Sequence, residues 1–150
     1  QMGAALMAFG NRVEDSFARI VQAKEAPSSI VWGKYDRNAL IRLPVVATDA
    51  RGRVVTPPTV EFRLPDGSAL PHLLLAGAAL AMIHGHETGD LDDLLQRTSV
   101  EAAARGDGST RLPRNFAEVA AALERHRDAL EFGETFPAAL IDRLLAVLKR

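Results

Sequence analysis

The chain has 150 residues and a mass of 16.2 kDa, with 47% hydrophobic and 25% charged residues. This composition is typical of one globular domain and excludes an intrinsically disordered chain. A formal net charge of -1 argues against binding to nucleic acid or to an anionic membrane through charge alone. Because the chain has no cysteine, disulfides and thiolate metal sites are excluded, and we expect a reducing compartment, the cytoplasm.

The longest apolar run, residues 70–83, is too short to cross a bilayer, which needs about 20 residues. The N-terminal residues lack the basic region, apolar stretch and cleavage site of a secretory signal, so we expect neither a membrane protein nor an exported one. Gln1 is not a translation start. We therefore expect either a tag remnant ahead of Met2 or a chain cut out of a longer protein.

Two helical segments open the chain. Residues 3–8 are small and apolar, which indicates the tail of a helix that Gly10 ends. Residues 11–21 carry apolar side chains at helical spacing, and Pro27 prevents that helix from continuing.

The hydrophobic period then changes to that of strands. Short segments rich in β-branched and aromatic residues predict strands over residues 29–33, 39–44 and 59–64. Their short links favour antiparallel pairing. An Asp and a Gly within residues 48–53 predict a turn, and Pro57-Pro58 confine the start of the third strand to a sheet edge.

From Pro71 to the C-terminus the chain is expected to be helical. Residues 73–83 are apolar on every side, which is typical of a helix buried inside a larger body. We therefore expect missing chain or a second subunit to cover that helix.

The remaining helices are expected over residues 91–105, 115–132 and 137–150. A loop is expected at residues 107–109, Asn115 and Glu118 have capping-box spacing, and Pro137 suits a first helical turn. The predicted fold class is α+β, an antiparallel sheet with helices packed around it.

Charged residues gather on the predicted sheet. Alternation along the third strand puts Glu61 and Arg63 on one face, with Val60, Phe62 and Leu64 on the other. Two interpretations of the charged pair stay open: a solvated ion pair on the sheet, or part of a site for an anionic substrate.

Four more charged residues belong to the same region of the sequence: Arg19, Glu25, Arg37 and Arg42. This is more charge than a small sheet needs for folding. It favours a site for phosphate or carboxylate groups, with a metal ion held partly by Glu61.

The histidines offer weaker support for a metal site. One residue separates His84 from His86 at the end of a predicted helix, and Glu87 is their only acidic neighbour in the sequence. His72 and His126 are expected to be packed or solvated helix residues.

Six motifs follow one another along the chain. They are Ser16-Phe-Ala-Arg19, Glu25-Ala-Pro27, Arg37-Asn38, Ile41-Arg42-Leu43-Pro44, Glu61-Phe62-Arg63-Leu64-Pro65-Asp66 and Pro71-His72-Leu73. In order and spacing this set resembles the C-terminal half of the catalytic domain of the glutamine synthetase family. The resemblance covers roughly residues 10–150, including Phe136-Pro137, which is similar to the Phe-Pro helix near the end of that domain.

The resemblance implies a ligase that makes glutamyl phosphate from ATP and glutamate and then lets ammonia displace the phosphate, using Mg or Mn ions. Glu25 matches the glutamate that helps to deprotonate ammonium and shields the acyl phosphate from water. Glu61 matches a metal ligand.

Four arginines complete the implied site. Arg19 and Arg63 match arginines that contact the glutamate carboxylate and the transferred phosphoryl group. Arg37 and Arg42 match arginines on the nucleotide phosphates. Such a ring of cations suits phosphoryl transfer, which depends on positioning and on neutralising charge.

The resemblance also implies parts outside these residues. The small N-terminal β-domain, the other metal carboxylates, the metal-binding histidine and the nucleotide segment are expected to precede Gln1. One carboxylate does not hold two divalent ions, so we expect the 150 residues alone to be inactive. The complete protein is expected to form homo-oligomeric rings, and this chain alone a monomer or weak dimer.

Two alternatives stay open. The ligase can join glutamate to another amine, such as a polyamine, because the amine pocket is only partly in this stretch. A noncatalytic relative or interaction domain can use the same sheet without turnover. The presence of all six charged residues argues against the second alternative, because a catalytically dead copy has no need of them.

Overall fold

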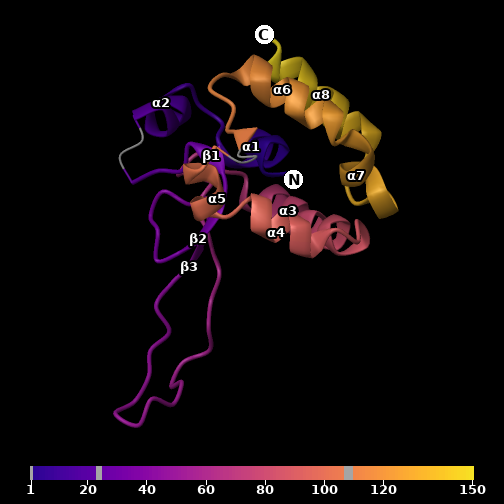
Figure 1. Cartoon of the computed structure of the whole chain (residues 1–150). Helices are drawn as coiled ribbons and strands as arrows, with labels where there is room; N and C mark the ends of the chain where they lie inside the picture. The colour runs from indigo at the N-terminus through magenta and orange to yellow at the C-terminus, as the bar shows by residue number, and fades with distance from the viewer. Residues whose placement is uncertain (1, 23–24, 107–109) are drawn as a thin grey trace.

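The computed structural model describes residues 2–22, 25–106 and 110–150 (Figure 1). The expected loop at residues 107–109 lies outside the described residues. The helices are α1 Gly3–Gly10, α2 Asp15–Gln22, α3 Pro71–Glu87, α4 Leu91–Arg97, α5 Val100–Ala104, α6 Phe116–Arg125, α7 Arg127–Glu131, η1 Phe132–Glu134 and α8 Ala138–Leu148. The strands are β1 Ser29–Ile30, β2 Trp32–Lys34, β3 Ile41–Leu43, β4 Glu61–Phe62 and β5 Thr110–Arg111.

Helix α1 lies in the middle of the helices. It packs against α6 on one side and α3 on the other (Figure 1), and Ala5, Met7, Ala8 and Phe9 are completely buried. A helix that is apolar on every side is stable only when other elements surround it. In this fold α1 is the helix that meets that condition.

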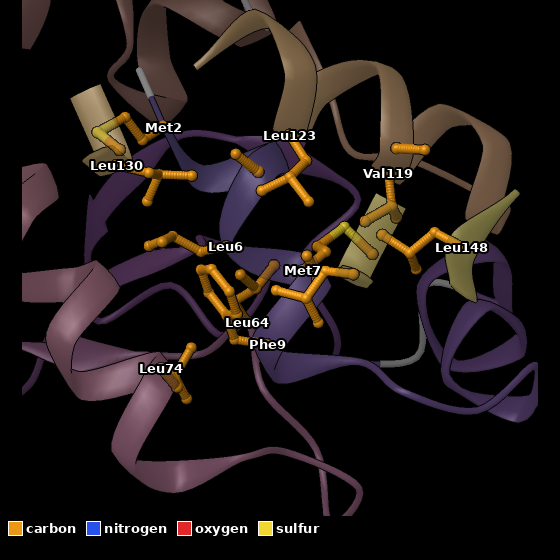
Figure 2. Packing of buried hydrophobic residues seen from close by; sticks show 14 of the residues in the cluster. Met2, Leu6, Met7, Phe9, Leu64, Leu74, Val119, Leu123, Leu130 and Leu148 are labelled. Carbon is orange, nitrogen blue, oxygen red and sulfur yellow. The ribbon is translucent and has the colours of Figure 1, made fainter. Parts of the chain in front are cut away.

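The core forms around α1. Figure 2 shows Met7 beside Val119 and Leu148, and it shows Phe9 beside Leu64. The ring of Phe9 also stacks on that of Phe136, with centroids 5.0 Å apart and planes 8° from parallel. Each large apolar side chain buried here stabilises the fold by about 1.5–3 kcal/mol. The core therefore holds α1 against α6, α7 and α8.

Helix α3 is covered on one face only. Leu74 and Leu80 are buried, and Gly77 lies so close to α1 that an added Cβ would stand 2.7 Å from a methyl group of Leu6. On the opposite face Met82 is 71% exposed. The described residues therefore cover one face of this helix, and the expectation that missing chain or a second subunit covers the other face stays a prediction.

Two small sheets replace the single antiparallel sheet that was expected. β1 pairs with β5 in antiparallel orientation, and β3 pairs with β4 in the same way. β2 and β3 are parallel, with Trp32 opposite Ile41, so the expectation of antiparallel pairing is wrong here. The link between them, residues 35–40, returns the chain to the end of the sheet where β2 began, so that β3 runs in the same direction as β2. Since each strand has only three residues, six residues of chain suffice for a return that normally needs a dozen.

The predicted first strand is divided at Val31, which is 6% exposed. The residues before it pair with β5 and those after it pair with β3. β5 has two exposed residues and no alternating pattern, so the sequence offered no signal for it. β4 is an edge strand, as Pro57-Pro58 predicted.

Most of the C-terminal half is helical, as predicted. The Asn115 side chain accepts a hydrogen bond of 2.8 Å from the Glu118 N–H, which confirms the predicted helix cap. The segment 115–132 is interrupted at His126, which separates α6 from α7. Pro137 is the N-cap of α8 and lies ahead of its first turn.

Residues 44–60 form an extended arm that projects away from the helices (Figure 1). Its tip is the predicted turn, where a Thr48–Val54 bridge closes the hairpin. The Asp49 carboxylate accepts a bond of 3.0 Å from the Arg53 N–H and another of 2.8 Å from its Nε. The turn is thus stabilised by its own side chains.

A buried polar junction, Asn11 with Asp66 and Ser68, joins the end of α1 to the chain that leaves β4. Asn11 is completely buried, and its Nδ2 donates to the Leu64 carbonyl and to Asp66 Oδ2, both at 3.2 Å. Asp66 Oδ1 accepts from the N–H and Oγ of Ser68 at 2.8 and 2.6 Å. The Asp66 N–H donates to the Gly10 carbonyl. This junction sets where the strand exit lies.

No helix within the described ranges of the chain is long and apolar enough to cross a membrane.

We expect Phe9→Ala to destabilise the chain by about 3–5 kcal/mol, because it removes a completely buried ring and leaves a cavity against Phe136. Phe132→Ala, at a ring that is 55% exposed, is the matched control and should change stability by less than about 1.5 kcal/mol. Urea unfolding followed by circular dichroism measures both. Equal losses in the two variants would contradict the central position of α1.

We expect Asp66→Asn to lower the free energy of unfolding at neutral pH by about 1–3 kcal/mol. Partial burial raises the pKa of Asp66. The polar groups of Ser16, Ser68 and Asn11 around its carboxylate lower the pKa by more than burial raises it, so the folded-state pKa lies below the ordinary value. The stabilisation is complete above the unfolded-state pKa of about 3.9 and is lost as the pH falls through the folded-state value.

Unfolding curves of the wild type and of Asp66→Asn at a series of pH values test this expectation. The difference between the two proteins should be constant above about pH 5 and should shrink below about pH 4. A difference that is the same at all pH values would show that the charge of Asp66 is not the source of its effect.

Candidate functional site

The site is built on the antiparallel pair of β3 and β4. Their register places Arg42 opposite Glu61 and Ile41 opposite Phe62. Phe62 packs against the hydrophobic core, so alternation turns Glu61 to the other face of the sheet. This confirms the predicted placement of Phe62 and Glu61 on opposite faces. Val60 lies before the strand and is exposed, so the prediction that it shares a strand face with Phe62 is wrong.

Glu61 lies between two arginines. Its Oε2 accepts from Arg42 Nη1 at 2.8 Å, and its Oε1 accepts from Arg63 Nη1 at 2.9 Å. Partial burial raises the pKa of Glu61, yet the hydrogen bonds and charges of the two arginines outweigh burial and hold the pKa below its ordinary value. The carboxylate is therefore ionised at neutral pH.

Arg63 also reaches the loop that carries Glu25. Its Nη2 donates to the Glu25 carbonyl at 2.7 Å, and Arg37 Nη1 donates to the Glu25 carboxylate at 3.0 Å. Glu25 has a positive φ of 54°, a conformation that a non-glycine residue adopts only where its surroundings hold it. The two arginines thus hold this residue by its backbone and by its side chain.

Arg19, on α2, donates to backbone rather than to a carboxylate. Its Nη2 donates to the Arg63 carbonyl at 3.0 Å, and its Nη1 donates to the carbonyls of Leu64 and Pro65 at 3.2 and 3.4 Å. These carbonyls follow the last paired residue of β4 and have no ladder partner there. Arg19 therefore anchors the backbone of Arg63 and thereby positions its side chain.

All six predicted site residues belong to one connected group. This Arg–Glu cluster consists of Arg19, Glu25, Arg37, Arg42, Glu61 and Arg63. Four cations face two carboxylates, so the cluster has excess positive charge. Its members differ in exposure: the side chains of Arg42 and Arg63 are 22% and 15% exposed, whereas Glu25 is 69% exposed.

Two buried nitrogens in the cluster have unused hydrogen-bonding capacity. Arg42 Nε and Arg63 Nε are buried, and neither has a hydrogen-bond acceptor within the described part of the chain. Buried guanidinium groups bind planar or tetrahedral oxyanions well because several N–H groups point in fixed directions. The exposed parts of Arg42 and Arg63 therefore offer positive charge to a carboxylate or phosphate group beside Glu61.

The described residues do not by themselves form a metal site. Within residues 2–22, 25–106 and 110–150 no three histidine, aspartate or glutamate side chains gather as metal ligands do. Glu61 offers one carboxylate at the sheet, and both of its oxygens already accept from arginines. His84 and His86, near the end of α3, belong to no such group either.

Sequence reasoning missed the residues that position the cluster. Asn11 was expected to begin a helix and Asp66 was noted only as part of a motif, yet both join α1 to the strand exit behind Arg63. A buried side-chain amide next to a helix end cannot be recognised from spacing, because its partner is more than fifty positions away.

Comparison with known proteins places these features in one family. The family model for the catalytic domain of glutamine synthetase matches residues 1–149. Glutamine synthetase of Frankia alni is 31% identical over 147 residues, which cover 94% of this chain and 29% of that protein. Glutamine synthetase of Thermococcus kodakarensis is 40% identical over 82 residues, which cover 54% of this chain and 17% of that protein.

The fold agrees with the sequence comparison. The cryo-EM structure of Plasmodium falciparum glutamine synthetase superposes with a TM-score of 0.75 at 18% identity, covering 97% of this chain and 35% of that one. The chain thus spans only about 29% of the length of the Frankia relative. Its helices and small sheets make an α+β fold, as predicted. The chain belongs to the glutamine synthetase catalytic-domain family.

Proposed function

We propose that this chain is the C-terminal portion of the catalytic domain of an ATP-dependent ligase that joins ammonia to glutamate through glutamyl phosphate. One observation carries the proposal. Six charged residues, separated by up to 44 positions in the sequence, are joined in a continuous set of hydrogen bonds on one face of the β3–β4 sheet.

The proposed roles of the arginines are those that the resemblance to the family implies. Arg63 and Arg19 lie at the strand exit and contact the glutamate carboxylate and the phosphoryl group during transfer. Arg37 and Arg42 contact the phosphates of ATP. Phosphoryl transfer gains most from fixed positive charge around the transferred group, and the half-buried Arg42 and Arg63, each bonded to Glu61, are proposed to supply it.

Arg19 acts first as a positioning residue in this proposal. Both of its terminal nitrogens donate to backbone carbonyls, so its first contribution is to hold Arg63 in place. Contact with a substrate oxygen would use the N–H groups that remain.

Glu25 is the proposed acceptor of a proton from ammonium. Its carboxylate is mostly exposed, and among the described residues it is paired with Arg37 alone. An exposed ion pair of this kind is stabilised by less than about 1 kcal/mol, so a cationic nucleophile can compete with Arg37 for the carboxylate. Because Arg63 holds its backbone, Glu25 remains beside the reacting groups when its side chain is released.

Divalent ions, Mg or Mn, would neutralise phosphate charge in such a ligase. Glu61 is the residue of this chain proposed to contribute one oxygen ligand. The other ligands do not lie in the described part of the chain. We propose that the 150 residues alone have no ligase activity for this reason.

The complete protein is proposed to act in the cytoplasm as a homo-oligomeric ring whose subunits share their sites. This chain alone is proposed to be a monomer or weak dimer.

We expect Arg63→Lys in the complete enzyme to lower kcat by about 100- to 1,000-fold. Lysine keeps the charge but does not bridge Glu61 and the Glu25 carbonyl through two nitrogens. Arg111→Ala is the matched control, because it removes an arginine that pairs with a glutamate at the same 2.9 Å outside the cluster. Release of ADP with glutamate and ammonium measures turnover; full activity of Arg63→Lys would overturn the proposal.

We expect ammonium to be the best acceptor in a panel of amines that includes a polyamine. The measurement is ADP release by the complete enzyme at saturating ATP and glutamate. Activity with the polyamine and none with ammonium would instead establish a γ-glutamyl ligase for that amine. Absence of ATP binding in the presence of Mg or Mn would establish a noncatalytic relative.

A further inference from the structure

A cavity of about 370 Å³ lies between α1, α4 and α6, apart from the Arg–Glu cluster. In Figure 1 α6 lies above the start of α1 and α4 lies below it. Polar side chains from three elements line the cavity: Arg97 and Thr98 at the end of α4, Thr110 on β5, and Arg125 and His126 at the end of α6. We propose that this cavity binds a small organic phosphate.

The lining is positively charged. None of the described residues that line the cavity is acidic. Arg125 has no carboxylate partner anywhere in the described part of the chain. Arg97 has two, Asp90 and Asp93, but at 3.5 and 3.3 Å these pairs are longer than the 2.7–2.9 Å of close charge-assisted bonds. Arg125 is therefore available to an anion, whereas the charge of Arg97 is offset by its two carboxylates.

The pKa of His126 agrees with a positive charge in the cavity lining. Burial lowers its pKa, and positive charges that include Arg125 and His84 lower it further. A bound anion would act in the opposite direction, because an opposite charge favours the protonated imidazole. The histidine thus reports whether the cavity is occupied.

The arrangement of donors favours phosphate over a planar carboxylate. Guanidinium, hydroxyl and imidazole groups from separate parts of the chain line the same cavity, so it offers several N–H and O–H donors. A phosphate presents three terminal oxygens to such a set. The threonine hydroxyls can each donate one further bond, for which Thr98 Oγ1 would exchange its present bond to the Leu94 carbonyl.

The rest of the cavity suits a small apolar group attached to that phosphate. Ala4, Ile30 and Leu94 form the other part of its wall. The volume falls in the range of about 300–1,000 Å³ found for small-molecule sites. A lining that combines charged and apolar side chains is typical of sites for organic anions, where polar groups orient the ligand and apolar groups enclose it.

Nuclear magnetic resonance of the 150-residue chain with phenyl phosphate as the probe tests the proposal. We expect the amide signals of Thr98 and Thr110 to shift with a saturating dependence on the probe. We expect the pKa of His126 to rise at saturation, because a bound anion favours the protonated imidazole. Phenol should not bind, and inorganic phosphate should bind more weakly than phenyl phosphate.

Two variants decide whether the cavity is the site. Arg125→Ala should weaken binding by about tenfold, the loss of one charged contact. Arg143→Ala removes an exposed arginine from α8, outside the cavity, and should leave the affinity unchanged. Equal losses in the two variants, binding of phenol, or no response of Thr98, Thr110 and His126 would overturn the proposal. None of these measurements depends on ligase activity, so they are independent of the proposed function.

Discussion

The carbonyl groups of residues 63–65 impose the constraint on which the site depends. They follow a strand of two residues at a sheet edge, so the sheet ladder does not pair them. Backbone carbonyls that leave water need hydrogen-bond partners, and an unpaired one destabilises the fold by about 1–3 kcal/mol. Arg19 and Asn11 supply these partners from α2 and from the end of α1.

As a result, hydrogen bonds connect the hydrophobic core to the Arg–Glu cluster. Asn11 extends from α1, which lies at the centre of the core, and the same segment is bonded to Asp66. A change in the packing of α1 therefore reaches the strand exit and the side chain of Arg63. Rigid support of this kind suits a site that acts by placing charge, because misplacement of a charged group weakens its effect on the transition state.

Charge in this protein is arranged in two ways. In the Arg–Glu cluster the carboxylates of Glu25 and Glu61 hold the arginines in position and offset part of their charge. In the cavity beside α4 and α6, Arg125 has no such partner in the described chain. The first arrangement fixes geometry before a ligand arrives. The second leaves positive charge for an anion to neutralise.

How far the sequence could predict the fold depended on whether a feature is local. The cap at Asn115, the hairpin turn at Asp49 and the helical C-terminal half follow from neighbouring residues, and all three are confirmed. The parallel pairing of β2 with β3 and the existence of β5 are set by contacts between distant segments. Strands of two or three residues have too few side chains to display a period, so their partners could not be read from the pattern.

The burial of the helices likewise depends on contacts between distant segments. Both α1 and α3 are rich in apolar residues, and sequence reasoning assigned the fully buried position to α3. Among the described elements α1 is the helix that others surround, with α6 and α3 on its two sides. Helix α3 packs against α1 and α7 and exposes Met82 on the face that missing chain or a second subunit is expected to cover. High hydrophobicity indicates that a segment can be buried. Which segment lies at the centre depends on how the others surround it.

By itself the sequence determined the helical and turn segments, the predicted family and the six residues of the Arg–Glu cluster, because motif order and local propensity are written along the chain. Only the tertiary structure decided how those residues are connected. It showed that Arg19 holds backbone, that Arg63 bridges Glu61 and Glu25, and that Asn11 supports them. Hydrogen bonds between residues about 40 to 50 positions apart arise only when the chain has folded, since each needs both groups within about 3 Å.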